Sequence, residues 1–350
     1  LIDFNGEYST LAKSFPVLTK TVELSTKEIK DKLVFSENEF WDDELLSVLF
    51  SATEKTQKPF LTHLVKNKNS FDNDLNGYLK HTIKNMFGTN PHRETLNLLK
   101  GLIVYLTDKD QLRANEELSK FSWHTGNNKY DHPDSWINNS DDAIAYLPVT
   151  YNSSFVINSV FDEIFIRSTL QLINSVSKNY VQYEHISPLI NKISATGPSL
   201  SKVIEITEHH KDQVPISIIS LKHCNQSTKK TIPMMIAKCS FLEHKSTDNE
   251  IESFHLIIDE AHNILSEISS RESESWKDYR LELFEEIIKE GRKFGYFVTI
   301  SSQRPYDISP TIISQLHNYF IHRLVNENDL FLLKNTLSTL DAASRSLIPT

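Results

Sequence analysis

The chain carries two patterns of apolar positions, and each occupies its own part of the sequence. Through much of residues 20–190, apolar residues recur every three or four positions, with polar breaks at 66–76 and 122–140. This spacing is typical of amphipathic helices that bury one face. We therefore expect residues 13–205 to form a mostly helical domain.

Short apolar runs rich in β-branched residues replace the helical pattern further along the chain. Helical patterns at 231–244 and 279–293 separate these runs, and a short apolar start precedes a turn at Gly6. Strands that alternate with helices indicate a parallel sheet with right-handed crossovers. The sequence thus predicts an α/β fold, with strands at the start of the chain and at 214–221, 254–258, 296–303 and 319–325.

Three residues carry signals for the starts of helices. Ser36 followed by Glu39 has the spacing of a capping box. Pro233 fits best in the first turn of the helix at 231–244. Asp329 is placed to cap a further helix that runs to Leu337.

Two adjacent carboxylates, Asp259 and Glu260, follow the apolar run that begins at Phe254. Ligands bind at the C-terminal ends of strands in open α/β sheets, which is where these side chains are expected. A nucleotide-hydrolysing enzyme needs one carboxylate for the Mg²⁺ that bridges the phosphates and another for the attacking water. We assign Asp259 to the metal and Glu260 to the water. The alternative is a strand that ends in a solvated acidic turn.

Composition narrows the class of protein. The 350 residues are 39% hydrophobic and 24% charged, as in folded globular proteins. A net charge of −9 argues against a protein that coats nucleic acid with its whole surface, but it allows a local basic pore. No apolar run has membrane-spanning length, and no secretory signal follows Leu1. Cys224 and Cys239 lack metal-type spacing and are expected to be reduced, buried thiols, which predicts a cytoplasmic protein without a membrane partner.

Several motifs, taken together, resemble the HerA branch of the FtsK–HerA ATPases. They are DEAHN at 259–263, GRKFG at 291–295, SSQRP at 301–305, the spacing Arg323-x-x-Asn326-x-x-Asp329, and Asp3-x-x-Gly6-Glu7-Tyr8. The resemblance covers about residues 1–10 and 214–350. It implies a RecA-like P-loop ATPase core with a mostly parallel sheet, which starts at 1–12, is interrupted by a large helical insertion at 13–205 and continues through 206–350.

The same motifs supply further candidates for the site. Gln303 ends the strand beside that of Asp259, where its amide can sense the γ-phosphate or hold the attacking water; the alternative is a capped strand end. Arg292 lies at a helix terminus beside glycines, so it can reach a phosphate in its own or a neighbouring subunit. The alternative is a cation that stabilises the helix dipole. Weaker candidates for the phosphates are Lys293, Arg304 and Arg323.

The resemblance also implies that Asp3 and Glu7 lie near the nucleotide and assist Mg²⁺ or water. A P-loop, in contrast, is missing from these residues. It needs Gly-Lys followed by Ser or Thr to hold phosphates, and none of the eight glycines precedes a lysine. If the resemblance holds, the P-loop is expected upstream of Leu1; the alternative is an inactive ATPase.

The function that the resemblance implies is a homo-hexamer that hydrolyses ATP with Mg²⁺ and threads double-stranded DNA through its pore. Family members work with a nuclease in end resection, or with a nuclease or sirtuin-like effector in antiphage defence. The Asn-, Lys- and Ile-rich composition suggests an AT-rich bacterial genome and favours the defence setting. One alternative is an ATP-binding ring that assembles a partner effector. A DEAH-box helicase is less favoured, since both Ser-Ala-Thr sequences, 51–53 and 194–196, precede the DEAH motif.

Overall fold

The computed structural model describes residues 1–69, 74–88, 90–207, 214–246, 252–268, 274–322, 326 and 329. The chain divides into two compact units: unit 1 contains Leu1–Phe35 and Lys202–Thr350, and unit 2 contains Ser36–Ser201. The predicted boundaries at residues 12 and 205 differ from this division, because two strands that precede Ser36 pair with strands of unit 1. Each unit is described below by itself.

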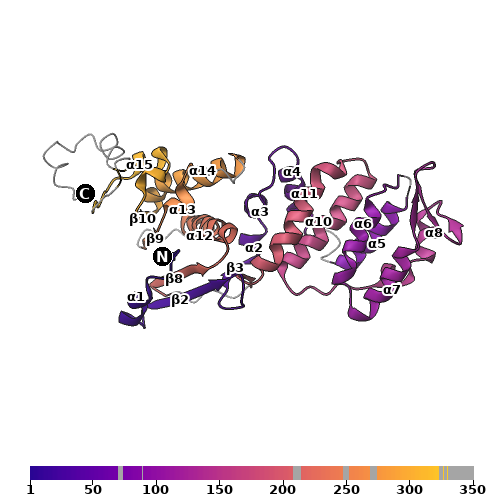
Figure 1. Ribbon diagram of the computed structural model, residues 1–350, viewed down its shortest axis with the longest axis horizontal. Coiled ribbons are helices and arrows are strands. Elements are labelled where there is room, and N and C mark those ends of the chain that lie inside the picture. The colour runs from indigo at the N-terminus through magenta and orange to yellow at the C-terminus, as the bar shows by residue number, and fades with distance from the viewer. Residues whose placement is uncertain are drawn as a thin grey trace. The chain divides into compact units, whose positions relative to one another are not determined.

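A five-stranded sheet forms the centre of unit 1, and every pair of neighbouring strands in it is parallel (Figure 1). The strand order is β10-β9-β1-β8-β2. β9 and β10 pair along their whole length, from Phe254 opposite Tyr296 to Ile258 opposite Ile300. This arrangement confirms the predicted α/β fold. The strands are β1 (Ile2–Asp3), β2 (Thr19–Ser25), β8 (Ile216–His223), β9 (Phe254–Ile258) and β10 (Tyr296–Ile300).

The passage from helix α14 into β10 depends on two glycines. A Cβ on Gly291 would lie 2.6 Å from the carbonyl oxygen of Tyr296, so the chain can turn this tightly only with glycine. Gly295 follows with a φ of +73°, a region that glycine enters without steric conflict. The helical elements of unit 1 are α1 (Ser9–Ser14), α12 (Gln226–Ser246), α13 (His262–Leu265), α14 (Glu274–Glu290), η3 (Gly291–Phe294), η4 (Pro305–Asp307) and α15 (Pro310–Gln315).

Two local predictions in unit 1 were wrong. Pro233 lies inside α12 and not in its first turn, because Asn225 starts the helix earlier by accepting a hydrogen bond from the Thr228 amide at 2.8 Å. The fourth strand predicted at 319–325 is not formed by residues 319–322, and residues 323–325 lie outside the described part of the chain. The Tyr319 hydroxyl instead donates to the carbonyl of Ile313 in α15, which holds this segment back against that helix.

Asp329 has a contact that the sequence did not predict. Its carboxylate accepts a hydrogen bond from the Tyr306 amide at 2.9 Å, and the residue is buried. The helix that Asp329 was predicted to cap lies outside the described residues. Its capping role therefore stays a prediction.

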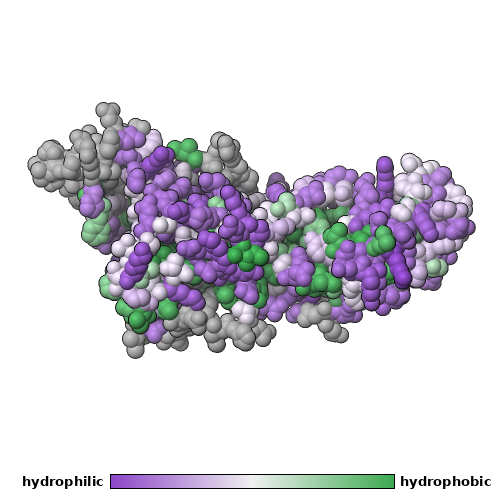
Figure 2. Space-filling model, turned by 60° about the horizontal axis from the view of Figure 1, so that its bottom comes forward, coloured by the Kyte–Doolittle hydropathy of each residue, from purple (hydrophilic) through white to green (hydrophobic). Residues whose placement is uncertain are grey.

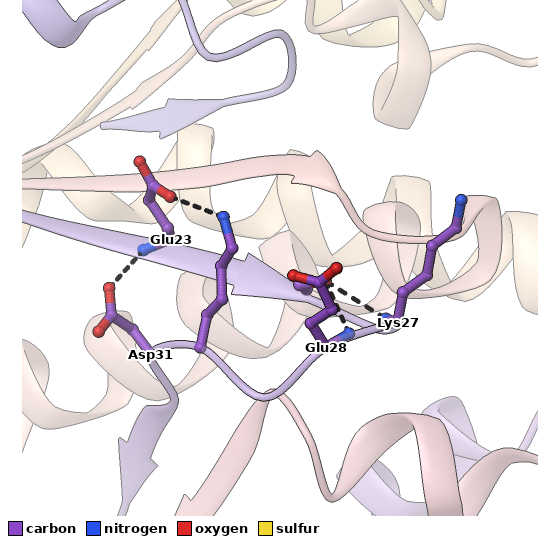
Figure 3. A network of polar contacts seen from close by, with 6 residues as sticks. Glu23, Lys27, Glu28 and Asp31 are labelled. Carbon is purple, nitrogen blue, oxygen red and sulfur yellow. Dashed lines mark hydrogen bonds and ion pairs between the residues drawn. The ribbon is translucent and has the colours of Figure 1, made fainter.

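The connection from β2 to the short strand β3 (Leu33–Phe35) is held by its own polar groups (Figure 3). The Lys30 ammonium pairs with the Glu23 carboxylate at 3.0 Å, and Asp31 accepts the Glu23 amide at 2.8 Å. The Ser25 hydroxyl accepts the Glu28 amide at 3.2 Å. These contacts hold the turn at 26–32, whose residues are charged or polar except for Ile29, against the end of β2. The turn leads into β3 and its parallel partner β7 (Ile204–Ile206).

Unit 2 is built around helix α10, which packs against α4, α5, α6 and α11. The predicted capping box is confirmed: Ser36 accepts the Glu39 amide, and Glu39 accepts the Ser36 amide. The stretch predicted as a long loop at 122–140 contains a three-stranded antiparallel sheet, β4 (Ser122–His124), β5 (Lys129–His132) and β6 (Ser135–Trp136). The helices are α2 (Glu37–Phe40), α3 (Asp43–Leu49), α4 (Gln57–Lys66), α5 (Leu75–Met86), α6 (Thr95–Gly101), η2 (Ile103–Tyr105), α7 (Asp108–Ser119), α8 (Ser140–Ala145), α9 (Pro148–Asn152), α10 (Val160–Ser177) and α11 (Tyr183–Leu200).

The surface of both units is mostly hydrophilic in the view of Figure 2, with small separate areas of apolar side chains. Scattered apolar residues of this kind are normal on folded proteins. Among the described residues, none of the helices combines the length and the hydrophobicity that a membrane crossing requires.

Candidate active site at the carboxyl edge of the sheet

The C-terminal ends of β1, β9 and β10 meet at one edge of the sheet. The Asp259 amide donates to the carbonyl of Ile2 at 3.1 Å, which joins the ends of β9 and β1. The Ala261 amide donates to the carbonyl of Ser301 at 2.8 Å, which joins the acidic turn to the residue after β10. Asp259 and Glu260 therefore stand at the sheet edge where the sequence placed them.

Asp259 is buried, with 8% of its surface exposed, and the hydroxyl of Tyr8 lies against it. Burial raises the pKa of the Tyr8 hydroxyl, and the negative charges of Asp259, Asp3 and Glu7 and a hydrogen bond to Asp259 raise it further. The hydroxyl consequently stays protonated and serves as a donor among three carboxylates. The sequence motif contained Tyr8, but nothing in its spacing assigned this role.

Glu260 has an unusual backbone and a confined side chain. Its φ is +46°, in the left-handed region that residues with a Cβ rarely enter. The side chain is 13% exposed, and Oε2 lies 3.2 Å from Nδ1 of His262. No described residue donates a hydrogen bond of good geometry to this buried oxygen. Strained backbone of this kind is typical of functional sites.

Asp3 serves the fold directly. Its Oδ1 accepts the amides of Asn5 at 3.1 Å, Gly6 at 2.7 Å and Glu7 at 3.2 Å, and Oδ2 accepts the Tyr8 amide at 3.4 Å. The carboxylate thus fixes the turn that carries Glu7 and Tyr8, and Gly6 supplies its φ of +79°. Glu7 is exposed on this turn. Contacts of Asp3 and Glu7 with a nucleotide stay predictions.

Replacing Asp3 with alanine should lower the free energy of unfolding by about 2 kcal/mol, because four partly buried backbone amides lose their acceptor. Asp3→Asn, which keeps an oxygen at Oδ1, should lower it by less. Urea denaturation measures both, with Glu7→Ala at the exposed position as the control. Equal stability of Asp3→Ala and Glu7→Ala would contradict the structural role.

Gln303 and Arg304 are exposed just beyond β10 and line a groove of about 1510 Å³ that runs along this edge strand. Arg292 lines the same groove, but from the other end of the strand. It lies in η3, before β10 begins, whereas Glu260 lies beside the residues that follow β10. A five-residue strand spans about 16 Å. The structure therefore places Gln303 two residues past Ser301, whose carbonyl accepts the Ala261 amide, and places Arg292 before the opposite end of β10.

The other basic candidates have different surroundings. Lys293 pairs with Glu290 at 2.8 Å, as expected for a cation at the end of a helix. Arg323 lies outside the described residues.

Whether the acidic pair suits Mg²⁺ depends on how many ligand atoms the protein must supply. The described residues contain no group of three or more His, Cys, Asp or Glu side chains placed to hold a metal. Mg²⁺ in nucleotide-hydrolysing proteins is typically bound by one or two carboxylates, with phosphate oxygens and water as its other ligands. Asp259, at the carboxyl edge of the sheet, offers one carboxylate of the kind that this mode needs.

Arg280 supports the segment that follows the acidic turn. This role was not predicted from the sequence. It is 1% exposed, and its guanidinium donates to the carbonyls of Ile264 and of Ser266, the latter at 2.9 Å. It also lies 5.4 Å from the ring centre of Trp276. Burial lowers the pKa of Arg280 to about 10. Because α13 begins two residues after Glu260, this arginine anchors the segment that positions the pair.

A scan against models of protein families finds no match. The chain is 28% identical over 188 residues to the DNA double-strand break repair helicase HerA of Sulfurisphaera tokodaii. This alignment covers 51% of this chain and 36% of the relative. It is 26% identical over 184 residues to the HerA helicase of Sulfolobus acidocaldarius, which covers 50% of this chain and 35% of the relative. The solved structure of VirB4 of Thermoanaerobacter pseudethanolicus aligns with the whole of this chain and with 75% of the VirB4 chain. The TM-score is 0.49 and the sequence identity is 10%.

The chain thus spans about a third of the length of the curated relatives that it matches. The resemblance inferred from the motifs is confirmed: about half of this chain is similar in sequence to HerA helicases.

Proposed function

We propose that this chain contributes the acidic side of an ATP-hydrolysing site in a DNA translocase or helicase of HerA type. The observation that carries the proposal is the position of Asp259 and Glu260 at the carboxyl edge of a parallel sheet, where the Ala261 amide bonds to the Ser301 carbonyl two residues before Gln303. The similarity to HerA helicases supports the same reaction class.

In the proposed reaction, a water oxygen attacks the γ-phosphorus, the bond from that phosphorus to the bridging oxygen breaks, and ADP leaves. Glu260 orients the water and takes its proton. Asp259 would hold Mg²⁺, which would supply positive charge to the phosphates. Gln303 directs its amide to the water or the γ-phosphate, and the Tyr8 hydroxyl keeps the Asp259 carboxylate in place.

The assembly that we propose is a homo-hexamer around double-stranded DNA. Arg292 supports it, because an exposed arginine at the far end of β10 reaches a nucleotide only if that nucleotide belongs to a neighbouring subunit. A nuclease or a sirtuin-like effector is the proposed partner, in DNA end processing or antiphage defence. These finer assignments rest on the family resemblance.

The test is ATP hydrolysis by the intact protein that contains this chain, with and without linear double-stranded DNA. We expect hydrolysis that requires Mg²⁺ and is several-fold faster with DNA. Reactions with EDTA or with an equal amount of single-stranded DNA are the controls. A protein that forms rings and binds an effector but hydrolyses no ATP would show that the chain is a scaffold.

A further inference from the structure

We propose that His262 is a positioning residue, which holds the carboxylate of Glu260 and connects it to Ser302 at the tip of β10. This inference rests on the proposed function, because it concerns the residue that orients the attacking water. The sequence places His262 in the DEAH motif but gives it no task.

One nitrogen of His262 lies between the two groups. Nδ1 is 3.2 Å from Oε2 of Glu260 and 3.2 Å from Oγ of Ser302. A neutral imidazole nitrogen either donates or accepts, depending on the tautomer. With a proton on Nδ1 it donates to the carboxylate, and without one it accepts from the serine hydroxyl. Both groups therefore lie within reach of a single nitrogen: the contact with Ser302 has hydrogen-bond geometry, and a small reorientation of the ring or the carboxylate would form the bond to Glu260 instead.

The surroundings of Glu260 determine why a hydrogen bond from His262 Nδ1 to its carboxylate is important. Its Oε2 is buried and receives no well-formed hydrogen bond from the described residues, and a buried carboxylate oxygen without a donor is unfavourable. His262 Nδ1 is the imidazole donor in reach, and its side chain is 17% exposed, so it is held close by its neighbours.

Ser302 extends the connection to the other half of the site. Its hydroxyl accepts the amide of Arg304 at 3.0 Å, and Gln303 lies between the two residues. A shift of this tip, for example when Gln303 contacts a γ-phosphate, changes the position of Ser302 and hence the hydrogen bond available to His262. His262 thereby relates the position of the water-orienting carboxylate to the state of the β10 tip.

The experiment compares His262→Ala, His262→Asn and Ser302→Ala in the intact protein. We expect His262→Ala to lower kcat for ATP hydrolysis by about 10- to 100-fold, because a misplaced reacting group slows the chemical step. The Kd of a fluorescent ATP analogue and the Tm should stay close to the wild type. His262→Asn, which places an amide nitrogen near the position of Nδ1, should restore much of kcat.

The kcat of a double variant shows whether His262 and Ser302 act as a connected pair or independently of each other. His262→Ala with Ser302→Ala should be no slower than His262→Ala alone, because the serine acts through the histidine. Unchanged kcat in His262→Ala, or a loss of Tm that Asn does not restore, would overturn the inference while the proposed function stands. A wild type that hydrolyses no ATP would overturn both.

Discussion

Glu260→Gln should lower kcat for ATP hydrolysis by at least about 100-fold, while the protein still binds ATP. Glutamine has nearly the same shape, so it can occupy the confined site beside His262, but its amide cannot accept the proton of the attacking water. The substitution leaves Asp259 and its hydrogen bond from Tyr8 in place. Binding of nucleotide and Mg²⁺ should therefore persist, and kcat should fall much more than the affinity.

Single-turnover hydrolysis and binding of a fluorescent ATP analogue measure the two effects separately. Glu282→Gln, at an exposed position of α14, removes the same charge away from the sheet edge and should leave both unchanged. If Glu260→Gln hydrolysed ATP at more than about a tenth of the wild-type rate, another group would have to activate the water.

Arg280→Ala is expected to have the largest effect on stability, about 3–5 kcal/mol of the free energy of unfolding. The substitution leaves the carbonyls of Ile264 and Ser266 without this donor and opens a cavity next to Trp276. The region destabilised includes α13, so Glu260 and His262 should also lose their fixed positions. Activity should then fall together with stability.

Urea denaturation and Tm measure the loss. Arg280→Lys keeps a cation but cannot donate to both carbonyls in the same planar geometry, so it should fall between alanine and the wild type. Asp278→Ala, at an exposed position of the same helix, should change stability by less than about 0.5 kcal/mol. An Arg280→Ala protein as stable as Asp278→Ala would show that the buried guanidinium contributes little.

The position of the acidic pair was predictable because one physical rule decides it. The apolar run from Phe254 is too short for a helix, and in a parallel sheet the residues that follow such a strand lie at the ligand-binding edge. The same rule bears on Arg292, for which the sequence left open a phosphate of its own or of a neighbouring subunit. A helix that precedes a parallel strand ends at the strand's opposite edge, so an arginine there lies away from a ligand in its own subunit.

Arg280 also left a signal in the sequence. It precedes Phe284 by four positions and Ile287 by seven, so it shares the buried face of α14 with them. An arginine on that face indicates carbonyl partners inside the protein. Tyr8 left no such signal, because its contact with Asp259 joins positions far apart in the sequence. Strand β2 was missed for a related reason: its exposed and buried residues do not alternate regularly, and its pairing with β8 decides its structure.

The left-handed φ of Glu260 has a consequence for how this protein changes over evolutionary time. At such an angle an ordinary residue is disfavoured by about 1–2 kcal/mol, whereas glycine or asparagine is well tolerated. A lineage released from the need to hydrolyse nucleotide would gain stability by exchanging this glutamate for either residue. The identity of the residue at this position in related chains is therefore a marker that distinguishes working motors from retired ones.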